Sequence, residues 1–330
     1  MQIKSLNPAE SASDLAAALP PFRTMRREIK PGLPEIGKTW LRYFSGTEPL
    51  EWNAVVGAFV EGRSEAVGLA FCGGQLDENL DLGWLNLEVP AEGRRLGADV
   101  ALFEAAAKRC AAEGRTRLAV PLYEAFDPTA FAEKFSGRKV SSTLNSALDP
   151  SEIDRAEYES WAAPSEKNAE YSLVHWTDRC PDGLAESFCR AMDAMHDQPM
   201  GDLDYGWVEN NVQRLRIDEE FTRCHDVRRH VLAALDADGR VAGYNSFTTV
   251  PDEPATAEIW DTGVIRAHRG HGLGLRIKAA ATLWLLETHP AARWVETANN
   301  ASNQWMINVN RKLGYRVIAT WHGYEFPIGG

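Results

Sequence analysis

The sequence predicts an α/β (α+β) protein of two tandem units, each a mixed, mainly antiparallel sheet flanked by helices. Three observations predict this class. β-rich runs joined by tight turns indicate hairpins, and amphipathic helices follow them. The same order of segments recurs in the second half of the chain. The 330 residues are also long enough for two domains.

The repeat is marked by three residues in each half. Val89, Arg94 and Gly97 stand where a predicted strand ends and a helix begins. The same residue types recur 175 positions later, with the same spacing. Two copies of one strand–helix unit in tandem are therefore the economical interpretation. The second copy comprises Val264, Arg269 and Gly272.

The first half shows both periodicities. Apolar residues recur every three or four positions where a helix is expected, and they form short continuous runs where strands are expected. A Pro-Pro pair is expected to end the first helix, because proline lacks the N–H that a helix interior uses. The predicted elements are a helix at 8–19 ended by Pro20-Pro21, a hairpin of strands 53–60 and 65–71, a strand at 80–89, a helix over Leu96–Cys110 and a strand at 117–120.

A polar, acidic, proline-containing stretch at 145–168 separates the two halves. We therefore expect a first domain at 1–150, a linker at 151–168 and a second domain at 169–330. The elements predicted after the linker are a strand at 170–177, a helix at 182–196, a hairpin at 230–249, a strand at 255–264, a helix after Gly272 and a strand at 293–297.

Composition excludes several classes of function. Lys and Arg number 35 against 47 Asp and Glu, a formal net charge of −12. Nucleic acid and anionic membranes both select basic surfaces, so neither is expected as a partner. The five cysteines are scattered without a CxxC pair, and we expect no metal and no disulfide framework. Because no signal-peptide pattern and no apolar run of membrane length occurs, the sequence predicts a cytoplasmic protein. A monomer or homodimer is expected.

Residues 269–274 read Arg-Gly-His-Gly-Leu-Gly between a strand and an amphipathic helix. Glycines let the backbone turn tightly and bring N–H groups close to a ligand, and the helix N-terminus adds partial positive charge. This pattern suits a pyrophosphate. It is neither a Walker loop, which needs Gly-Lys-Ser/Thr, nor a dinucleotide-binding fingerprint, because Leu275 stands where the third glycine belongs.

The order of motifs over about 255–316 resembles the GNAT N-acetyltransferase superfamily, with weaker likeness over about 170–327. The motifs are Val264, the Arg-x-x-Gly-x-Gly loop, and an Asn-rich helix that begins at Asn303 and ends Leu-Gly-Tyr. The chain also resembles tandem two-domain acetyltransferases of actinobacterial type, among them mycothiol synthase. The resemblance implies acetyl-CoA as co-substrate. It implies cofactor-binding roles for Val264, Arg269, Gly270, His271, Gly272, Leu273, Gly274 and Asn303.

The resemblance also implies candidate catalytic residues. In many members of the family a Tyr at the position of Asn310 protonates the leaving thiolate, and here that role is vacant; Tyr315, Tyr324 and Tyr205 are candidates. Direct attack on a thioester needs a neutral amine, whereas an alkylamine with a pKa near ~10 is protonated at pH 7. Glu258, which matches a family glutamate, is the candidate base. Asp261 is the rival, expected on the opposite face of the strand.

The first half departs further from the pattern. Asp99 replaces the second glycine, and Gly83 stands where the counterpart of Glu258 would be. This half is therefore predicted to be a degenerate, non-catalytic copy that completes the acceptor cleft.

The predicted function is acetyl transfer from acetyl-CoA to a primary amine of a small molecule by direct attack, with the second half catalytic. The alternative is a non-catalytic acyl-CoA-binding sensor or scaffold. An acidic, aromatic loop is expected to bind a cationic acceptor through ion pairs and cation–π contacts. Its candidate residues are Asp202, Asp204, Tyr205 and Trp207.

Overall fold

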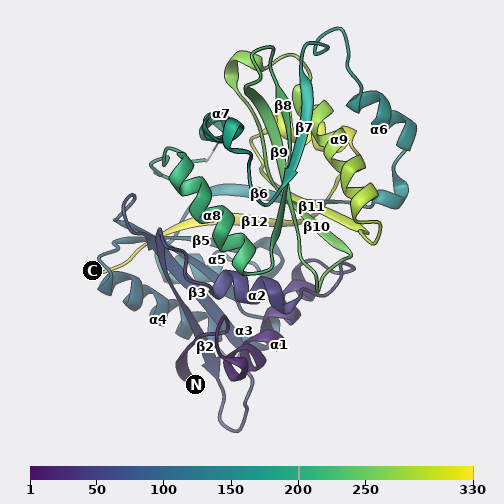
Figure 1. The fold of residues 1–330 in the computed structure, drawn as a ribbon. Helices are drawn as coiled ribbons and strands as arrows, with labels where there is room; N and C mark the ends of the chain where they lie inside the picture. The colour runs from purple at the N-terminus through teal and green to yellow at the C-terminus, as the bar shows by residue number, and fades with distance from the viewer. Residues whose placement is uncertain (200, 330) are drawn as a thin grey trace. The chain divides into compact units, whose positions relative to one another are not determined.

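The computed structural model describes residues 1–199 and 201–329, and the chain divides into two compact units. The first comprises Met1–Leu144, Met200–Gly206 and Ala319–Gly330, and the second comprises Asn145–Pro199 and Trp207–Ile318. Both are mixed α/β units with mostly antiparallel strands and flanking helices, as the sequence predicts (Figure 1).

The sheet of the first unit has the order β1-β2-β3-β4-β5-β12. All neighbours in it are antiparallel except β4 and β5, which are parallel. Strand β12 comes from the far end of the sequence, and strands β6 and β12 each have residues in both units. The strands are β1 (Gln2–Leu6), β2 (Glu51–Phe59), β3 (Gly68–Gln75), β4 (Leu82–Glu88), β5 (Arg117–Tyr123), β6 (Arg138–Leu148) and β12 (Arg316–Pro327). The helices are α1 (Ala12–Ile29), α2 (Lys38–Ser45), α3 (Ala91–Arg95), α4 (Ala98–Ala112) and α5 (Thr129–Lys134).

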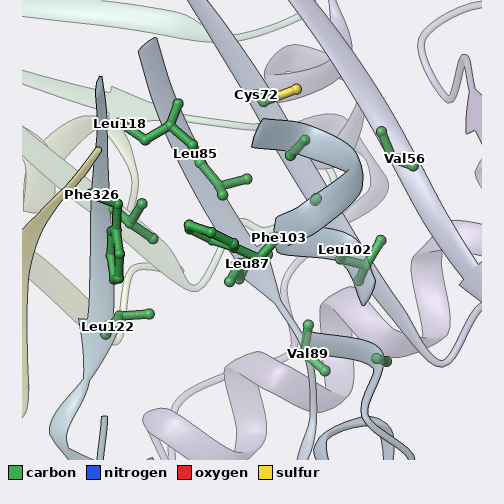
Figure 2. Close-up of a cluster of buried hydrophobic side chains, with 14 of the residues drawn as sticks. Val56, Cys72, Leu85, Leu87, Val89, Leu102, Phe103, Leu118, Leu122 and Phe326 are labelled. Carbon is green, nitrogen blue, oxygen red and sulfur yellow. The ribbon is translucent and has the colours of Figure 1, made fainter. Parts of the chain in front are cut away.

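The core of the first unit lies between α4 and the sheet. Figure 2 shows Leu102 and Phe103 of α4 facing the apolar side chains of β3, β4 and β5. Phe326 of β12 is fully buried there, and its ring centroid lies 5.0 Å from that of Phe103. A segment late in the sequence therefore completes the core of the first unit.

Helix α1 continues through Pro20 and Pro21, so the predicted end of this helix at the Pro-Pro pair was wrong. A proline inside a helix frees the carbonyl four residues earlier. The carbonyl of Ala17, freed by Pro21, accepts a hydrogen bond from the N–H of Ala66 at 3.0 Å. Pro21 is itself buried, on the apolar face that α1 presents to its unit. Packing and a substitute donor thus compensate for Pro21.

The second unit has strands in the order β11-β10-β9-β8-β7, all antiparallel except the pair β10–β11. Tyr244 of β9 packs against α7, whereas Phe247 packs toward α9, so these helices cover opposite faces of the sheet. The strands are β7 (Ser172–Thr177), β8 (Arg228–Leu235), β9 (Val241–Thr249), β10 (Thr256–Val264) and β11 (Trp294–Asn300). The helices are α6 (Arg155–Ala162), α7 (Asp182–Met192), α8 (Val212–Cys224), α9 (Leu273–Thr288) and α10 (Gln304–Lys312).

The stretch predicted as a linker, 151–168, contains helix α6 and belongs to the second unit. Tyr158 of this helix is buried in the core of that unit, and its hydroxyl donates to the carbonyl of Leu313 at 2.6 Å. The polar, acidic composition of the stretch 151–168 reflects the exposed face of a short helix that is capped by Asp154.

Candidate functional site

The candidate site lies where the parallel strands β10 and β11 separate. Their pairing runs only from Thr256 opposite Trp294 to Ile259 opposite Thr297. Both strands continue beyond these pairs, β10 to Val264 and β11 to Asn300. The facing edges then carry backbone N–H and C=O groups that lack the partners a continuous sheet would supply. An extended ligand could pair with them.

A cavity of about 460 Å³ lies at this separation, in the size range of ligand pockets. Its wall combines β10, β11, the loop before α9, the first turn of α10 and the short 3-10 helix η3 (Asp193–Asp197) with the two residues that follow it. The residues that line it are Ala194, Met195, Asp197, Gln198, Pro199, Ile259, Trp260, Asp261, Thr262, Gly263, Val264, Arg269, Gly270, Thr297, Ala298, Asn299, Asn303, Trp305 and Met306.

One end of the cavity meets the N-terminus of α9. Gly272 is the N-cap and has a φ of 73°, in the left-handed region that glycine tolerates. The N–H of Arg276 donates to the carbonyl of Gly272, so the preceding N–H groups have no acceptor within the helix. Together with the helix dipole they form a site for an anion. The cavity-lining Arg269 and Gly270 belong to the same loop.

Arg269, predicted to bind the cofactor, uses its side chain to hold the loop. Its Nε donates to the carbonyl of Val264 at 3.0 Å, and its Nη2 pairs with Asp197 at 2.7 Å. The first unit repeats the first of these contacts, because Nε of Arg94 donates to the carbonyl of Val89 at 2.8 Å. The equal spacing in the two halves of the sequence thus corresponds to the same hydrogen bond, from an arginine side chain to a valine carbonyl, within each unit.

The remaining residues of the loop differ in their surroundings. Leu273 is buried in the core. The carbonyl of His271 accepts a hydrogen bond from Asn168. A Cβ on Gly274 would lie 2.5 Å from the ring of Trp305, so close packing of this ring explains the glycine. Trp305 is 57% exposed and lines the cavity. Sequence reasoning missed it, although it lies only two residues after Asn303.

Two carboxylates of β10 lie on the same face of the sheet. Glu258 stands opposite Thr248 of β9, and Asp261 stands opposite Ser246. A bulge between Ile259 and Asp261 takes up one residue and restores the alternation. The expectation that Asp261 lies on the face opposite Glu258 was therefore wrong, because simple alternation does not hold across a bulge.

The two carboxylates differ in access to the cavity. Asp261 lines the cavity, whereas Glu258 is half-buried and is not one of the lining residues. Desolvation raises the pKa of Asp261, and the guanidinium of Arg229 only partly offsets this effect. Arg229 itself pairs with Asp218. A carboxylate with a raised pKa at a cavity wall is suited to accept a proton.

The Asn-rich helix supplies amides rather than an acid. Asn303 lines the cavity and caps α10 by accepting the N–H of Met306 at 3.2 Å. Asn310 is buried, and its Nδ2 donates to Oδ1 of the cavity-lining Asn299 at 2.6 Å. The amide at the position of the family's tyrosine therefore fixes a neighbour in the cavity wall.

Tyr315, a candidate acid in the sequence, lies in the hydrophobic core and is 6% exposed. It is not one of the residues that line the cavity. Desolvation raises the pKa of Tyr315 well above its usual value. The Nζ of Lys278 lies 5.0 Å from the centroid of its ring.

The predicted acceptor loop is divided between the two units. Asp202, Asp204 and Tyr205 belong to the first unit, whereas Trp207 belongs to the second and stacks on His196 with a centroid distance of 4.8 Å. The backbone carbonyl of Asp204 accepts from Arg117, and the Tyr205 hydroxyl accepts from Gln75. The carboxylates of Asp202 and Asp204 belong to exposed residues. Their role in acceptor binding stays a prediction.

Over residues 1–199 and 201–329, no group of three or more His, Cys, Asp or Glu side chains could hold a metal ion. None of the helices within these ranges combines the length and the apolar character needed to cross a membrane.

Comparison with known proteins agrees with this geometry. Residues 192–315 match the model of the acetyltransferase (GNAT) family. None of the curated proteins matches the chain in sequence. A solved tandem GNAT protein from the clavulanic acid biosynthesis pathway is 24% identical, with a TM-score of 0.80 over 100% of this chain and 99% of its own. A GCN5-related N-acetyltransferase from Sphaerobacter thermophilus is 14% identical, with a TM-score of 0.65 over 100% and 96%.

The matched residues contain the whole lining of the cavity and the glycine-rich loop. Residues 192–315 therefore carry the sequence pattern of the acetyltransferase (GNAT) family. The chain as a whole has the fold of a tandem GNAT protein.

Proposed function

We propose that the second unit transfers an acetyl group from acetyl-CoA to a primary amine of a small molecule. The observation that carries the proposal is the continuity of the separated strand edges of β10 and β11 with the free N–H groups at the start of α9. The pantetheine arm of CoA carries amides that can pair with the strand edges. Its pyrophosphate suits the helix N-terminus near Gly270 and Gly272.

The first unit lacks the chemistry for the same role. Asp99 lies in the first turn of α4, at the position equivalent to Gly274, and its carboxylate would repel a pyrophosphate. The guanidinium of Arg94 stacks on Phe126, with its Cζ 4.2 Å from the ring centroid. These contacts support a single cofactor per chain, held by the second unit.

The reaction is a direct attack of the amine nitrogen on the thioester carbonyl. A C–N bond forms and the C–S bond breaks. The protonated amine loses one proton before the attack and a second from the tetrahedral intermediate. We assign the first proton to Asp261, since it lines the cavity and burial raises its pKa, and the second to solvent. Glu258, on the same face, is the base predicted from the sequence, and its role stays a prediction. The thiolate can leave without an acid, because a thiol has a pKa near ~8.5. Asn310, at the position of the family's tyrosine, pairs with Asn299 of the cavity wall, and neither amide can act as an acid.

The cavity wall favours a cationic acceptor. Trp260 and Asp261 are neighbours in the wall, and Trp260 is 38% exposed. An aromatic face and a carboxylate together attract an ammonium group. The acceptor we propose is therefore a small amine that is protonated in solution and loses its proton in the cavity.

The proposal is tested by titrating the protein with CoA in a calorimeter and by following thiol release from acetyl-CoA with a panel of amines. We expect one CoA per chain and thiol release that depends on the amine. Binding without release under any amine would support the alternative of an acyl-CoA sensor. Absence of CoA binding would exclude both functions.

A matched pair of glycines tests which unit binds the cofactor. Gly272 and Gly97 are both helix N-caps with positive φ, 73° and 76°, so valine introduces the same backbone strain at each. Gly272→Val should abolish CoA binding, whereas Gly97→Val should leave Kd and stoichiometry unchanged. Calorimetry on both variants, with circular dichroism to confirm folding, provides the measurement. Loss of binding in Gly97→Val alone would assign the cofactor to the first unit.

A further inference from the structure

We infer that the segment 162–171, which precedes β7, positions the phosphate-binding loop, with Asn168 as the positioning residue. This inference rests on the proposed function, because it assigns the support of the loop that would hold the CoA pyrophosphate. The segment overlaps the stretch 151–168, whose composition resembles a linker. Its contacts show a different role.

The segment is tied to the first turn of α9 by Arg276. This side chain is 5% exposed, and its Nε donates to the carbonyl of Ala162 at 3.1 Å. Its Nη1 donates to the carbonyls of Asn168 at 2.7 Å and Tyr171 at 3.0 Å. Burying a guanidinium without a carboxylate partner is costly unless its donors are satisfied. Here three backbone carbonyls accept hydrogen bonds from it, which fixes the segment against the helix.

The same segment holds the loop at two points. Nδ2 of Asn168 donates to the carbonyl of His271 at 3.0 Å, and the Tyr171 hydroxyl lies 3.0 Å from Nδ1 of His268. Asn168 is itself oriented, since its Oδ1 accepts the N–H of Ser165 at 2.9 Å. Asn168 is 5% exposed, so these bonds are shielded from water. The residue that follows His271 is the N-cap glycine of α9.

The consequence is that the loop is ordered before any ligand arrives. A loop that is already ordered spares the ligand the entropy of ordering it, which raises affinity without adding a contact. Loss of the Asn168 amide frees the His271 carbonyl and the backbone around it. Releasing about one residue corresponds to a roughly tenfold weaker affinity.

The experiment compares Asn168→Ala with wild type by hydrogen exchange without ligand and by calorimetry with CoA. We expect exchange of the Arg269 and Arg276 amides, whose N–H groups donate to the carbonyls of Arg266 and Gly272, to become at least about tenfold faster. The Kd for CoA should rise roughly tenfold. Asn308→Ala removes an exposed asparagine side chain elsewhere in the same unit and is the control, with both quantities unchanged. Because Asn168→Ala could unfold the unit, Tyr171→Phe serves as a second variant that removes only the hydroxyl near His268 and should show smaller changes in the same direction.

The outcomes separate the two proposals. Wild-type protein that fails to bind CoA overturns the proposed function and this inference with it. Wild-type protein that binds CoA, together with unchanged loop exchange and unchanged Kd in folded Asn168→Ala and Tyr171→Phe, overturns the inference alone. Faster exchange throughout the second unit, rather than at Arg269 and Arg276, would also overturn it, because the segment would then support the fold and not the loop.

Discussion

Asp261→Asn should lower kcat by roughly 10²- to 10⁴-fold at pH 7, with little change in the Kd for CoA. Asparagine keeps the shape of the side chain but cannot accept the amine proton. The wild-type rate should fall as the pH drops through the raised pKa of Asp261, because only the carboxylate acts as a base. In the variant this limb disappears, and the deficit shrinks at high pH, where more of the amine is already neutral. Steady-state kinetics from pH 5 to 10 measure both effects.

Glu258→Gln is the matched variant, since it removes a carboxylate from the same face of the same strand. If Asp261 is the base, kcat in Glu258→Gln stays within a few-fold of wild type. A loss of 10²–10⁴ in Glu258→Gln together with near-normal Asp261→Asn would instead support the glutamate predicted from the sequence. Unchanged kcat in both variants would leave solvent as the base.

Lys278→Met should stabilise the protein by several kcal/mol at pH 6. Lys278 is 1% exposed, and burial lowers its pKa from 10.5 to about 7. In the folded state the charged form of Lys278 is disfavoured. The resulting loss of folding stability is complete below pH 7 and disappears above about pH 10.5. At about 1.36 kcal/mol per unit, the shift corresponds to about 5 kcal/mol. The wild-type free energy of unfolding should therefore rise between pH 7 and 10, relative to that of Lys278→Met.

Lys312→Met provides the control for Lys278→Met. Both ammonium groups lie over an aromatic ring, at 5.0 Å from that of Tyr315 and 5.1 Å from that of Trp161, but Lys312 is exposed. Its substitution should change the free energy of unfolding little and equally at all pH values. Urea unfolding at pH 6, 8 and 10 gives the comparison. A difference between wild type and Lys278→Met that does not depend on pH would contradict the buried, titrating lysine.

The parts of the fold predicted from the sequence are those set by local pattern. The strand–loop–helix unit around Gly272 was predicted because its glycines, its arginine and its helical stripe are all close in sequence. Helix α6 was missed because its eight residues carry one buried side chain, Tyr158, too few to show periodicity. The continuation of α1 through Pro21 depends on a distant donor, the N–H of Ala66, which no local pattern reveals.

The residues of the candidate site also divide into those with a local signal in the sequence and those without one. The anion site at the start of α9 follows from the loop sequence alone. The placement of Asp261 does not, because the bulge that brings it to the face of Glu258 is defined only by the pairing with β9. Asn168 lies about a hundred residues from the loop it contacts, and its role depends on the folded position of Arg276. Trp305 has a local signal, an aromatic residue two positions after Asn303, but composition does not distinguish it from a core residue.

The position of β12 has a consequence for synthesis on the ribosome. Residues 321–327 pair with β5 and insert Phe326 into the core of the first unit, yet they are translated after the entire second unit. At about 5–20 residues per second, the first unit waits on the order of ten seconds or more with one strand missing and an apolar edge open. A nascent chain carrying only residues 1–150 should consequently recruit chaperones, and its release from them should coincide with the emergence of β12.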